Sequence, residues 1–455
     1  MPMPSILRKD AVRLRREFRD TLVLAAPLVL GQLSAIGMNV VDTLLAGHYS
    51  APTLAAVAVG TNIWSLALVA AIGVMLALPP SVAQLAGAGE QTKIGALFRQ
   101  SLWLAFGLSV LLFIGVRHAG PLLRVIGIDP AIVDDTQKFL RAISWGAPAL
   151  TGYFAVRGFS EGLALTRPTM YFGFFGLLAL APIGYMLMYG AFGLPPRGAQ
   201  GTGMATALVL WLQLAAFIAY VGLRRHYRAF APFARFDWPH IGAILGLLRL
   251  GVPMGISLLM EAGLFVTTAL LVGSLGATVI ASHQIAINVA SVAFMLPLGV
   301  AMATTVRVGR AAGRDDAEGV RYAGYVGIGA CLLIQTLSCA AMALLPHGIA
   351  VLYTDDSAVA ALAAQLLLLA AIFQFSDGIQ VTANGALRGL KDTTMPMAIT
   401  VLAYWGIGMP LGYWLGFRAD MGVRGMWIGL IAGLTAAAVL LLARFVRLTR
   451  TYLKA

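Results

Sequence analysis

Long apolar segments recur along almost the whole of this 455-residue chain, and they constrain its fold more than any other feature. Each is long enough for an α-helix to cross the roughly 30 Å hydrocarbon core of a bilayer, and the short loops leave no room for a soluble domain. Only 11% of the residues are charged, against roughly a quarter in a soluble domain. The sequence therefore predicts an all-α polytopic membrane protein with twelve transmembrane helices, near 21–46, 54–80, 97–116, 139–156, 170–193, 203–223, 245–272, 279–306, 322–345, 358–381, 396–417 and 423–443.

The distribution of positive charge supports this number of helices. Twelve helices place both termini on one side of the membrane, and 25 of the 32 Lys and Arg residues then lie on that side. Because loops rich in Lys and Arg remain in the cytoplasm, both termini are predicted to be cytoplasmic. The basic stretch Arg8–Arg19 precedes an apolar run without a convincing signal-peptide cleavage site, so the first helix is expected to be retained.

The chain repeats itself at an offset of 226 or 227 residues. Each half holds six helices, an even number, so the halves are expected to be parallel repeats related by an axis along the membrane normal. In transporters built this way the substrate site lies between the halves. The identical pairs are Pro27/Pro253, Gly47/Gly273, Ala55/Ala281, Asn62/Asn288, Gly73/Gly299, Val74/Val300 and Gly87/Gly313 at 226, and Gly158/Gly385, Gly162/Gly389 and Thr166/Thr393 at 227.

This repeat divides the chain into two lobes joined by a linker. The linker interleaves Arg with aromatic residues, a pattern that can bind nucleic acid. Between two membrane helices it is expected instead to lie along the lipid headgroups, so the lipid bilayer is a predicted partner and nucleic acid is not. The expected parts are a basic N-terminal tail 1–20, an N-terminal six-helix lobe 21–223, the amphipathic linker 224–244, a C-terminal six-helix lobe 245–443 and a basic C-terminal tail 444–455.

Three acidic residues fall inside the predicted helices: Asp42 in the first, Glu261 in the seventh and Asp377 in the tenth. A carboxylate near the bilayer midplane costs about 2.5–3.5 kcal/mol on insertion scales. No Lys or Arg is expected at comparable depth to neutralise them. The three acids are therefore suited to exchanging protons or binding a bare cation. They do not correspond under the repeat, so the two halves are expected to have different roles.

Polar residues share helix faces with these acids, since residues three, four or seven apart lie on one side of a helix. Asn39 precedes Asp42 by three residues, and Asn384 follows Asp377 by seven. On the eighth helix, Gln284 and Asn288 lie one turn apart. Such groups could equally be hydrogen-bonded links between helices, worth about 0.6 kcal/mol each.

Methionine and aromatic side chains near these positions could line a substrate cavity, because they adapt to varied apolar ligands. They are also ordinary helix-packing residues, and packing is the more common role of any one of them. The candidates are Met254, Met260, Met295, Phe373, Phe375, Met397, Tyr404 and Trp405.

Several stretches of the sequence resemble the multidrug and toxic compound extrusion (MATE) family, particularly its NorM-like branch. The resemblance runs from about residue 20 to 447. It implies a V-shaped exporter of two six-helix bundles in the bacterial cytoplasmic (inner) membrane, which moves small cationic or amphipathic drugs out of the cell as H⁺ or Na⁺ enters. It implies a monomer that is not an enzyme and has no cofactor besides the coupling ion. The matching stretches are Val41–Gly47, Val82–Gly89, Ala281–Asn288, Arg307–Gly309 and Gly385–Asp392.

The same resemblance implies roles for the buried polar residues. Glu261 and Asp377 are similar to the cation-coupling carboxylates of the C-terminal half, where a Na⁺ ion could bind. Gln284 and Asn288 resemble their supporting groups. Asp42 resembles the acid of the N-terminal half, and Pro27 the proline that bends the first helix in some members.

Two departures from the family pattern bear on the coupling ion. Leu180 and Gly184 stand where many members carry an Asn pair beside the first-helix acid. Phe373 stands where the NorM-like branch often carries Tyr, four residues before Asp377. Both departures remove oxygen ligands, and this favours H⁺ over Na⁺, which needs several oxygens.

Three other functions fit the sequence less well. A lipid-linked oligosaccharide flippase of related fold would need a cationic cavity, whereas the midplane charges are acidic. An intramembrane enzyme would need His or Cys beside the acids; only His283 is near, no HExxH motif occurs, and Cys331 and Cys339 form no metal-binding pattern. A channel is disfavoured by the repeat and by the lack of a charged pore ring.

Overall fold

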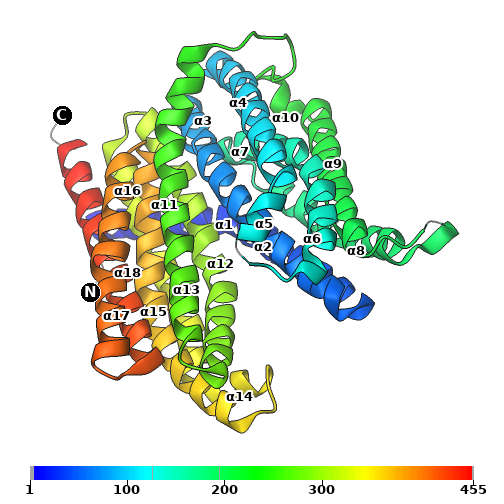
Figure 1. Ribbon diagram of the computed structural model, residues 1–455. Helices are drawn as coiled ribbons and strands as arrows, with labels where there is room; N and C mark the ends of the chain where they lie inside the picture. The colour runs from blue at the N-terminus through cyan, green and yellow to red at the C-terminus, as the bar shows by residue number, and fades with distance from the viewer. Residues whose placement is uncertain (1–4, 126, 194, 453–455) are drawn as a thin grey trace. The chain divides into compact units, whose positions relative to one another are not determined.

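The structure is a computed structural model that describes residues 5–125, 127–193 and 195–452. These residues are almost entirely helical, and none of them lies in a β-strand (Figure 1). The α-helices are α1 (Ser5–Tyr49), α2 (Ala51–Met75), α3 (Leu78–Gly87), α4 (Gln91–Arg117), α5 (Gly120–Val125), α6 (Pro130–Ile143), α7 (Ala147–Gly162), α8 (Arg167–Tyr189), α9 (Gly198–Leu223), α10 (Arg225–Arg228), α11 (Ile241–Gly273), α12 (Ala277–Gly313), α13 (Ala317–Leu344), α14 (Pro346–Val351), α15 (Ser357–Gly389), α16 (Thr394–Val401), α17 (Met409–Tyr413) and α18 (Gly422–Tyr452).

Within the described residues, eleven helical segments are long and apolar enough to cross a membrane. They correspond to eleven of the twelve expected spans. The expected helix at 139–156 is not one continuous α-helix, because a short 3₁₀ turn at Ser144–Gly146 separates α6 from α7. Pro148 explains this break, since proline has no N–H and cannot continue a helix from the preceding turn.

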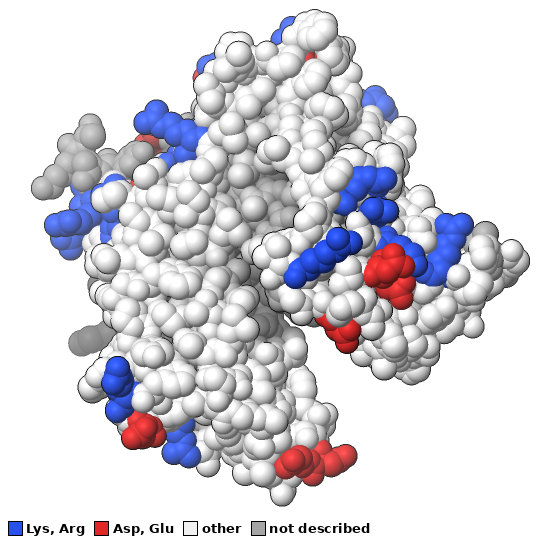
Figure 2. Space-filling model, in the orientation of Figure 1, with Lys and Arg blue, Asp and Glu red and all other residues white. Residues whose placement is uncertain are grey.

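The surface of the spans is largely apolar. Leu66, Leu111, Leu178, Leu270 and Leu337 are each more than 60% exposed. Figure 2 shows that most of the face in view carries no charge, and that its Lys, Arg, Asp and Glu side chains gather in patches. Exposed leucines along uncharged helices are the arrangement expected of a surface in contact with lipid tails.

The described chain packs as two compact units. One unit is Leu30–Gly255, and the other joins residues 5–29 to residues 256–452. The changes of unit therefore fall inside helices α1 and α11, each just after a proline (Pro27 and Pro253). The two boundaries are 226 residues apart, which is the offset of the sequence repeat. Each repeat thus contributes the first part of its leading helix to the unit formed by the other repeat.

Matching contacts hold these two exchanged segments. In the first unit, α11 meets α2: a Cβ added to Gly73 would lie 2.2 Å from the Cα of Gly255. In the second unit, α1 meets α12: a Cβ added to Gly299 would lie 3.0 Å from the backbone nitrogen of Val29. An offset of 226 converts one contact into the other. The glycines are needed because no side chain fits between helices at this separation.

Each unit has its own hydrophobic core. In Leu30–Gly255 the core includes the fully buried rings of Phe98, Phe139, Phe159 and Phe217. In the other unit, Trp427 is fully buried, packs against Phe373, and donates a hydrogen bond from Nε1 to Nδ1 of His283 at 3.2 Å. His283, the histidine nearest the acids in sequence, is therefore a buried packing partner of Trp427.

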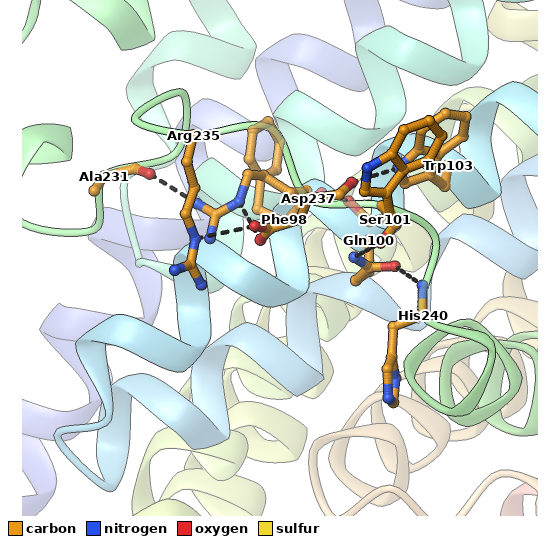
Figure 3. A network of polar contacts seen from close by, with 10 residues as sticks. Phe98, Gln100, Ser101, Trp103, Ala231, Arg235, Asp237 and His240 are labelled. Carbon is orange, nitrogen blue, oxygen red and sulfur yellow. Dashed lines mark hydrogen bonds and ion pairs between the residues drawn. The ribbon is translucent and has the colours of Figure 1, made fainter.

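The segment between α10 and α11 is fixed to α4 by a network of polar contacts (Figure 3). Arg99 of α4 donates to Asp237 at 2.6 Å and to the carbonyl of Ala231 at 2.9 Å. Gln100 donates to the carbonyl of Trp238 at 2.9 Å and accepts from the amide of His240 at 2.7 Å. The linker ends earlier than expected, because α11 begins at Ile241.

Candidate functional site

The arrangement of helices α11 and α15 places Glu261 and Asp377 at the same level of one unit. The ring of Phe265, one turn after Glu261, packs against the ring of Phe373, one turn before Asp377, with centroids 6.1 Å apart. Three chain reversals separate α11 from α15, so the two helices run in opposite directions. One turn away from this ring pair along either helix is therefore the same depth, and both carboxylates lie there.

The two carboxylates interact electrostatically with each other and with Tyr404. Asp377 is only 4% exposed, and its Oδ1 has no hydrogen-bond partner among the described residues. Tyr404 is fully buried, and its hydroxyl is likewise without a partner there. It lies in a π-helical segment, Leu402–Gly408, a geometry common at functional sites. Tyr404, predicted only as a cavity-lining residue, therefore brings a polar group to the acids.

Arg388 corrects the expectation that no basic residue lies near the acids. It occupies the last turn of α15, and its charge acts on Glu261. Its Nε is buried and has no hydrogen-bond partner within the described part of the chain. The predicted tenth helix ended at 381, which left Arg388 in a loop, but α15 continues to Gly389.

Other buried polar groups on the same helices lack partners within the described ranges. They are the hydroxyls of Thr268 and Thr382 and the carbonyl oxygen of Gln380. Buried polar atoms are nearly always hydrogen-bonded, so a group of unsatisfied ones is where water or an ion is expected. No set of three His, Cys, Asp or Glu side chains comes together in the residues that the structure describes. A cation here would therefore rest on two carboxylates and on neutral oxygens.

The predicted supporting residues of the C-terminal unit have different surroundings. Asn384 is buried on α15, with 5% exposure, whereas Gln284 and Asn288 are exposed on α12. Asn288 accepts a hydrogen bond from the hydroxyl of Tyr353 at 3.2 Å. No hydrogen bond in the described residues joins Gln284 or Asn288 to Glu261 or Asp377.

Asp42 lies in the other unit and has a partner that the sequence did not suggest. Its Oδ2 accepts a hydrogen bond from the hydroxyl of Thr206 on α9 at 3.1 Å, and its Oδ1 is buried without a partner in the described chain. Leu180 is fully buried among apolar residues of α8 and α9, and a side chain at Gly184 would collide with Leu45. Asn39 is exposed. The spacing of Thr202 and Thr206, one turn apart in an apolar helix, is the signal that could have identified α9 as the source of this contact.

A buried ion pair in the same unit was also missed. Arg157 donates from Nε to Glu161 at 2.6 Å and from a terminal nitrogen to Gln32 of α1 at 3.0 Å. Thr169 of α8 donates to Glu161 at 3.1 Å. The predicted fourth helix ended at 156, which placed both charges in a loop, whereas α7 extends to Gly162. An Arg and a Glu four residues apart beside an apolar run was the available signal.

The predicted cavity residues do not form one group. Met254 is 2% exposed and belongs to the unit Leu30–Gly255, whereas Met260, Met295, Phe373, Phe375, Met397, Tyr404 and Trp405 belong to the other unit. Trp405 donates from Nε1 to the carbonyl of Met260 at 3.1 Å, which ties the π-helical segment to α11 beside Glu261. A cavity of about 350 Å³ lies elsewhere, between Leu14 and Phe18 of α1 and Tyr322, Tyr325 and Ala330 of α13.

These features define an all-helical polytopic membrane protein with ionisable groups inside its spans, the arrangement typical of transporters. The sequence profile of the MatE family matches residues 27–186 and again residues 253–414. The two matches cover more than half of the chain, and they begin 226 residues apart, the offset of the internal repeat. The chain belongs to the MatE family, whose members are membrane transporters and not enzymes.

Individual relatives match along the full chain. The sequence is 51% identical over 434 residues to a probable multidrug resistance protein NorM of Xanthomonas axonopodis pv. citri, which covers 95% of each chain. It is 40% identical over 465 residues to the multidrug resistance protein PmpM of Pseudomonas aeruginosa, covering 100% of this chain and 96% of that one. A crystal structure of MATE in the straight conformation superposes with a TM-score of 0.88 at 19% identity, over 96% of this chain and 97% of that chain, and shows the same fold.

Proposed function

We propose that this protein is a multidrug efflux antiporter, which exports cationic or amphipathic organic compounds in exchange for the entry of H⁺ or Na⁺. The observation that carries this proposal is the buried, unpaired Oδ1 of Asp377 in electrostatic contact with Glu261 and Tyr404. Acidic groups within membrane spans are costly, and a purely structural contact does not need an ionisable side chain. Binding and release of a cation explains why two of them lie together. The relatives named as multidrug resistance proteins support the same activity.

Exchange follows if the coupling ion and the cationic substrate compete for the same carboxylates. Protonation or Na⁺ binding removes their negative charge and with it their attraction for the substrate. Transport further requires that the ion bind the inward-open and outward-open states with different affinity, because a ligand that binds both equally drives nothing. The repeated helical units support alternating access as the mechanism, since transporters with parallel repeats rock one repeat against the other.

The oxygen atoms at the site bear on the identity of the ion. A proton needs one carboxylate, whereas Na⁺ needs several oxygens. Phe373 supplies none, which favours H⁺. The hydroxyl of Tyr404 and the carbonyl oxygen of Gln380 are without partners in the described chain and could complete a Na⁺ site with the two acids. Asp42, with one unpaired oxygen beside Thr206, is a second group that could take up a proton.

We further infer that the protein acts as a monomer in the bacterial cytoplasmic membrane with both termini in the cytoplasm. The asymmetry of Lys and Arg between the two sides supports this orientation. A reporter fused to each terminus, active only in the cytoplasm or only in the periplasm, tests it directly.

The function is tested by dye transport in inverted vesicles, driven separately by a pH gradient and by a Na⁺ gradient. Wild-type protein is expected to accumulate ethidium under one of the two gradients, and that gradient names the ion. Glu261→Gln and Asp377→Asn are expected to abolish transport while remaining folded. Glu90→Gln is the matched control, because Glu90 is an exposed surface acid paired only with Lys93. Normal transport by Glu261→Gln would contradict the proposal.

A further inference from the structure

One face of α15 carries a line of buried polar residues that leads to Asp377. Asn384 follows Asp377 by seven residues and Arg388 follows Asn384 by four, so the three lie on one side of the helix. Side chains on a helix lean toward its N-terminus. Arg388 therefore extends back toward Asn384 and the level of the two acids, consistent with its electrostatic interaction with Glu261.

Arg388 has no acid of its own to neutralise it. It forms no ion pair with any residue that the structure describes, and its buried Nε has no hydrogen-bond partner there. Asp392, one turn later, is engaged by Arg444, which donates to it at 2.9 Å. A buried guanidinium is costly unless it is balanced by negative charge. Glu261 is the acid whose charge acts on it.

The other unit contains a related arrangement with a different charge balance. There Arg157 of α7 reaches Gln32 of α1, just as Arg388 of α15 acts on Glu261 of α11, and these helices correspond under the repeat. Arg157, however, is neutralised at 2.6 Å by Glu161 of its own helix. In the C-terminal unit the arginine is left for the acids of the site.

We propose that Arg388 is a fixed counter-charge of the Glu261–Asp377 pair and thereby determines the charge of the cation that the site accepts. Two ionised carboxylates and one guanidinium leave one net negative charge, which one monovalent cation or one proton balances. Without Arg388 the net charge is two, and a dication becomes the better match. This inference rests on the proposed function, since it assumes that the acids bind the substrate cation.

Ethidium and propidium test the inference, because they share the same ring system and carry one and two positive charges. Their dissociation constants for purified wild-type protein, Arg388→Gln and Arg388→Lys are measured by fluorescence polarisation. We expect Arg388→Gln to change the ratio of the two constants in favour of propidium by about tenfold or more, the effect of roughly one unit charge inside a protein. Arg388→Lys keeps the charge and is expected to keep the wild-type ratio. Arg321→Gln, which removes an exposed arginine of α13, is the control.

A second comparison does not depend on Arg388→Gln being stable alone. Glu261→Gln makes the site neutral and should weaken ethidium binding, whereas Glu261→Gln/Arg388→Gln restores one negative charge and should recover it. An unchanged ratio in Arg388→Gln, or a double variant that binds ethidium no better than Glu261→Gln, overturns the inference. If wild-type protein fails to transport either dye under any gradient, the proposed function itself is wrong. If Glu261→Gln is inactive but Arg388→Gln keeps the preference for ethidium, only the inference about Arg388 is wrong.

Discussion

The backbones of Gly73 and Gly255 lie against each other, because a Cβ built on Gly73 would be 2.2 Å from the Cα of Gly255. This contact fixes the first part of α11 to α2 within the unit Leu30–Gly255. The related contact of Gly299 with Val29 fixes the first part of α1 in the other unit. Both contacts lie immediately beside the residues at which the chain passes from one unit to the other.

We expect Gly73→Ala to destabilise the protein by about 1–3 kcal/mol, the usual cost of forcing an extra group into a packed interface. The measurement is the midpoint of thermal unfolding in detergent. Gly107→Ala is the matched control, because Gly107 is also inside a helix but has no neighbouring atom within 4 Å of an added Cβ. Equal midpoints for the two variants would show that α2 and α11 are not packed at this point.

We expect Glu161→Gln to destabilise the protein by about 3–5 kcal/mol, because it leaves the buried guanidinium of Arg157 without its counter-charge. The side chains of the pair are only 10% and 4% exposed. Asp134→Asn is the comparison, because its pair with Lys138 is exposed and such pairs contribute at most about 1 kcal/mol. A double-mutant cycle with Arg157→Gln measures the coupling. Coupling no larger than that of the Asp134–Lys138 pair would contradict the expectation.

Thr206→Val removes the hydroxyl that donates to Asp42 and leaves a side chain of similar shape. If Asp42 takes part in transport, we expect the apparent KM for ethidium to rise about threefold to tenfold, the effect of losing a hydrogen bond worth roughly 0.5–1.5 kcal/mol. Thr43→Val is the control, since the hydroxyl of Thr43 bonds only the carbonyl of Asn39 one turn earlier. The same KM in both variants would assign Asp42 no dependence on Thr206.

Asp237→Ala is expected to loosen the segment between α10 and α11, since Asp237 accepts from both Arg99 and Arg235. Limited proteolysis measures this, because cleavage requires local opening of the chain. Cleavage between residues 229 and 240 should become about tenfold faster, which corresponds to a loss of roughly 1.4 kcal/mol. Asp355→Ala, in an exposed loop, serves as the reference and should leave the rate at this segment unchanged.

The membrane fold and the three acids could be predicted from the sequence because each depends on local composition. An apolar segment of membrane length must form a helix in lipid, and an acid inside it stands out in any reading of the chain. The repeat was visible because glycine and proline recur where close packing or a bend requires them. Helix ends were the weak point, and errors there placed Arg157, Glu161 and Arg388 in loops.

The partners of the acids depend on tertiary packing and could not be predicted in the same way. Thr206 reaches Asp42 from a helix 164 positions away in the sequence. Tyr404 approaches Glu261 and Asp377 from a π-helical segment that no simple periodicity indicates. The exchange of helix segments was also hidden, because the repeat gives the internal similarity of the two halves but not which half each segment packs against.

The exchange of leading helix segments also affects how the protein is made. The first part of α1 emerges from the ribosome long before α12, the helix against which it packs. At about 5–20 residues per second, roughly 15–55 s separate the synthesis of the two. The newly made N-terminal half must remain in the membrane during this interval without its own lead segment in place, and it cannot be completed until the first part of α11 follows. Biogenesis of the two halves is therefore coupled: neither becomes a finished bundle on its own, and a chain cut at the linker should assemble only when both pieces are synthesised in the same membrane.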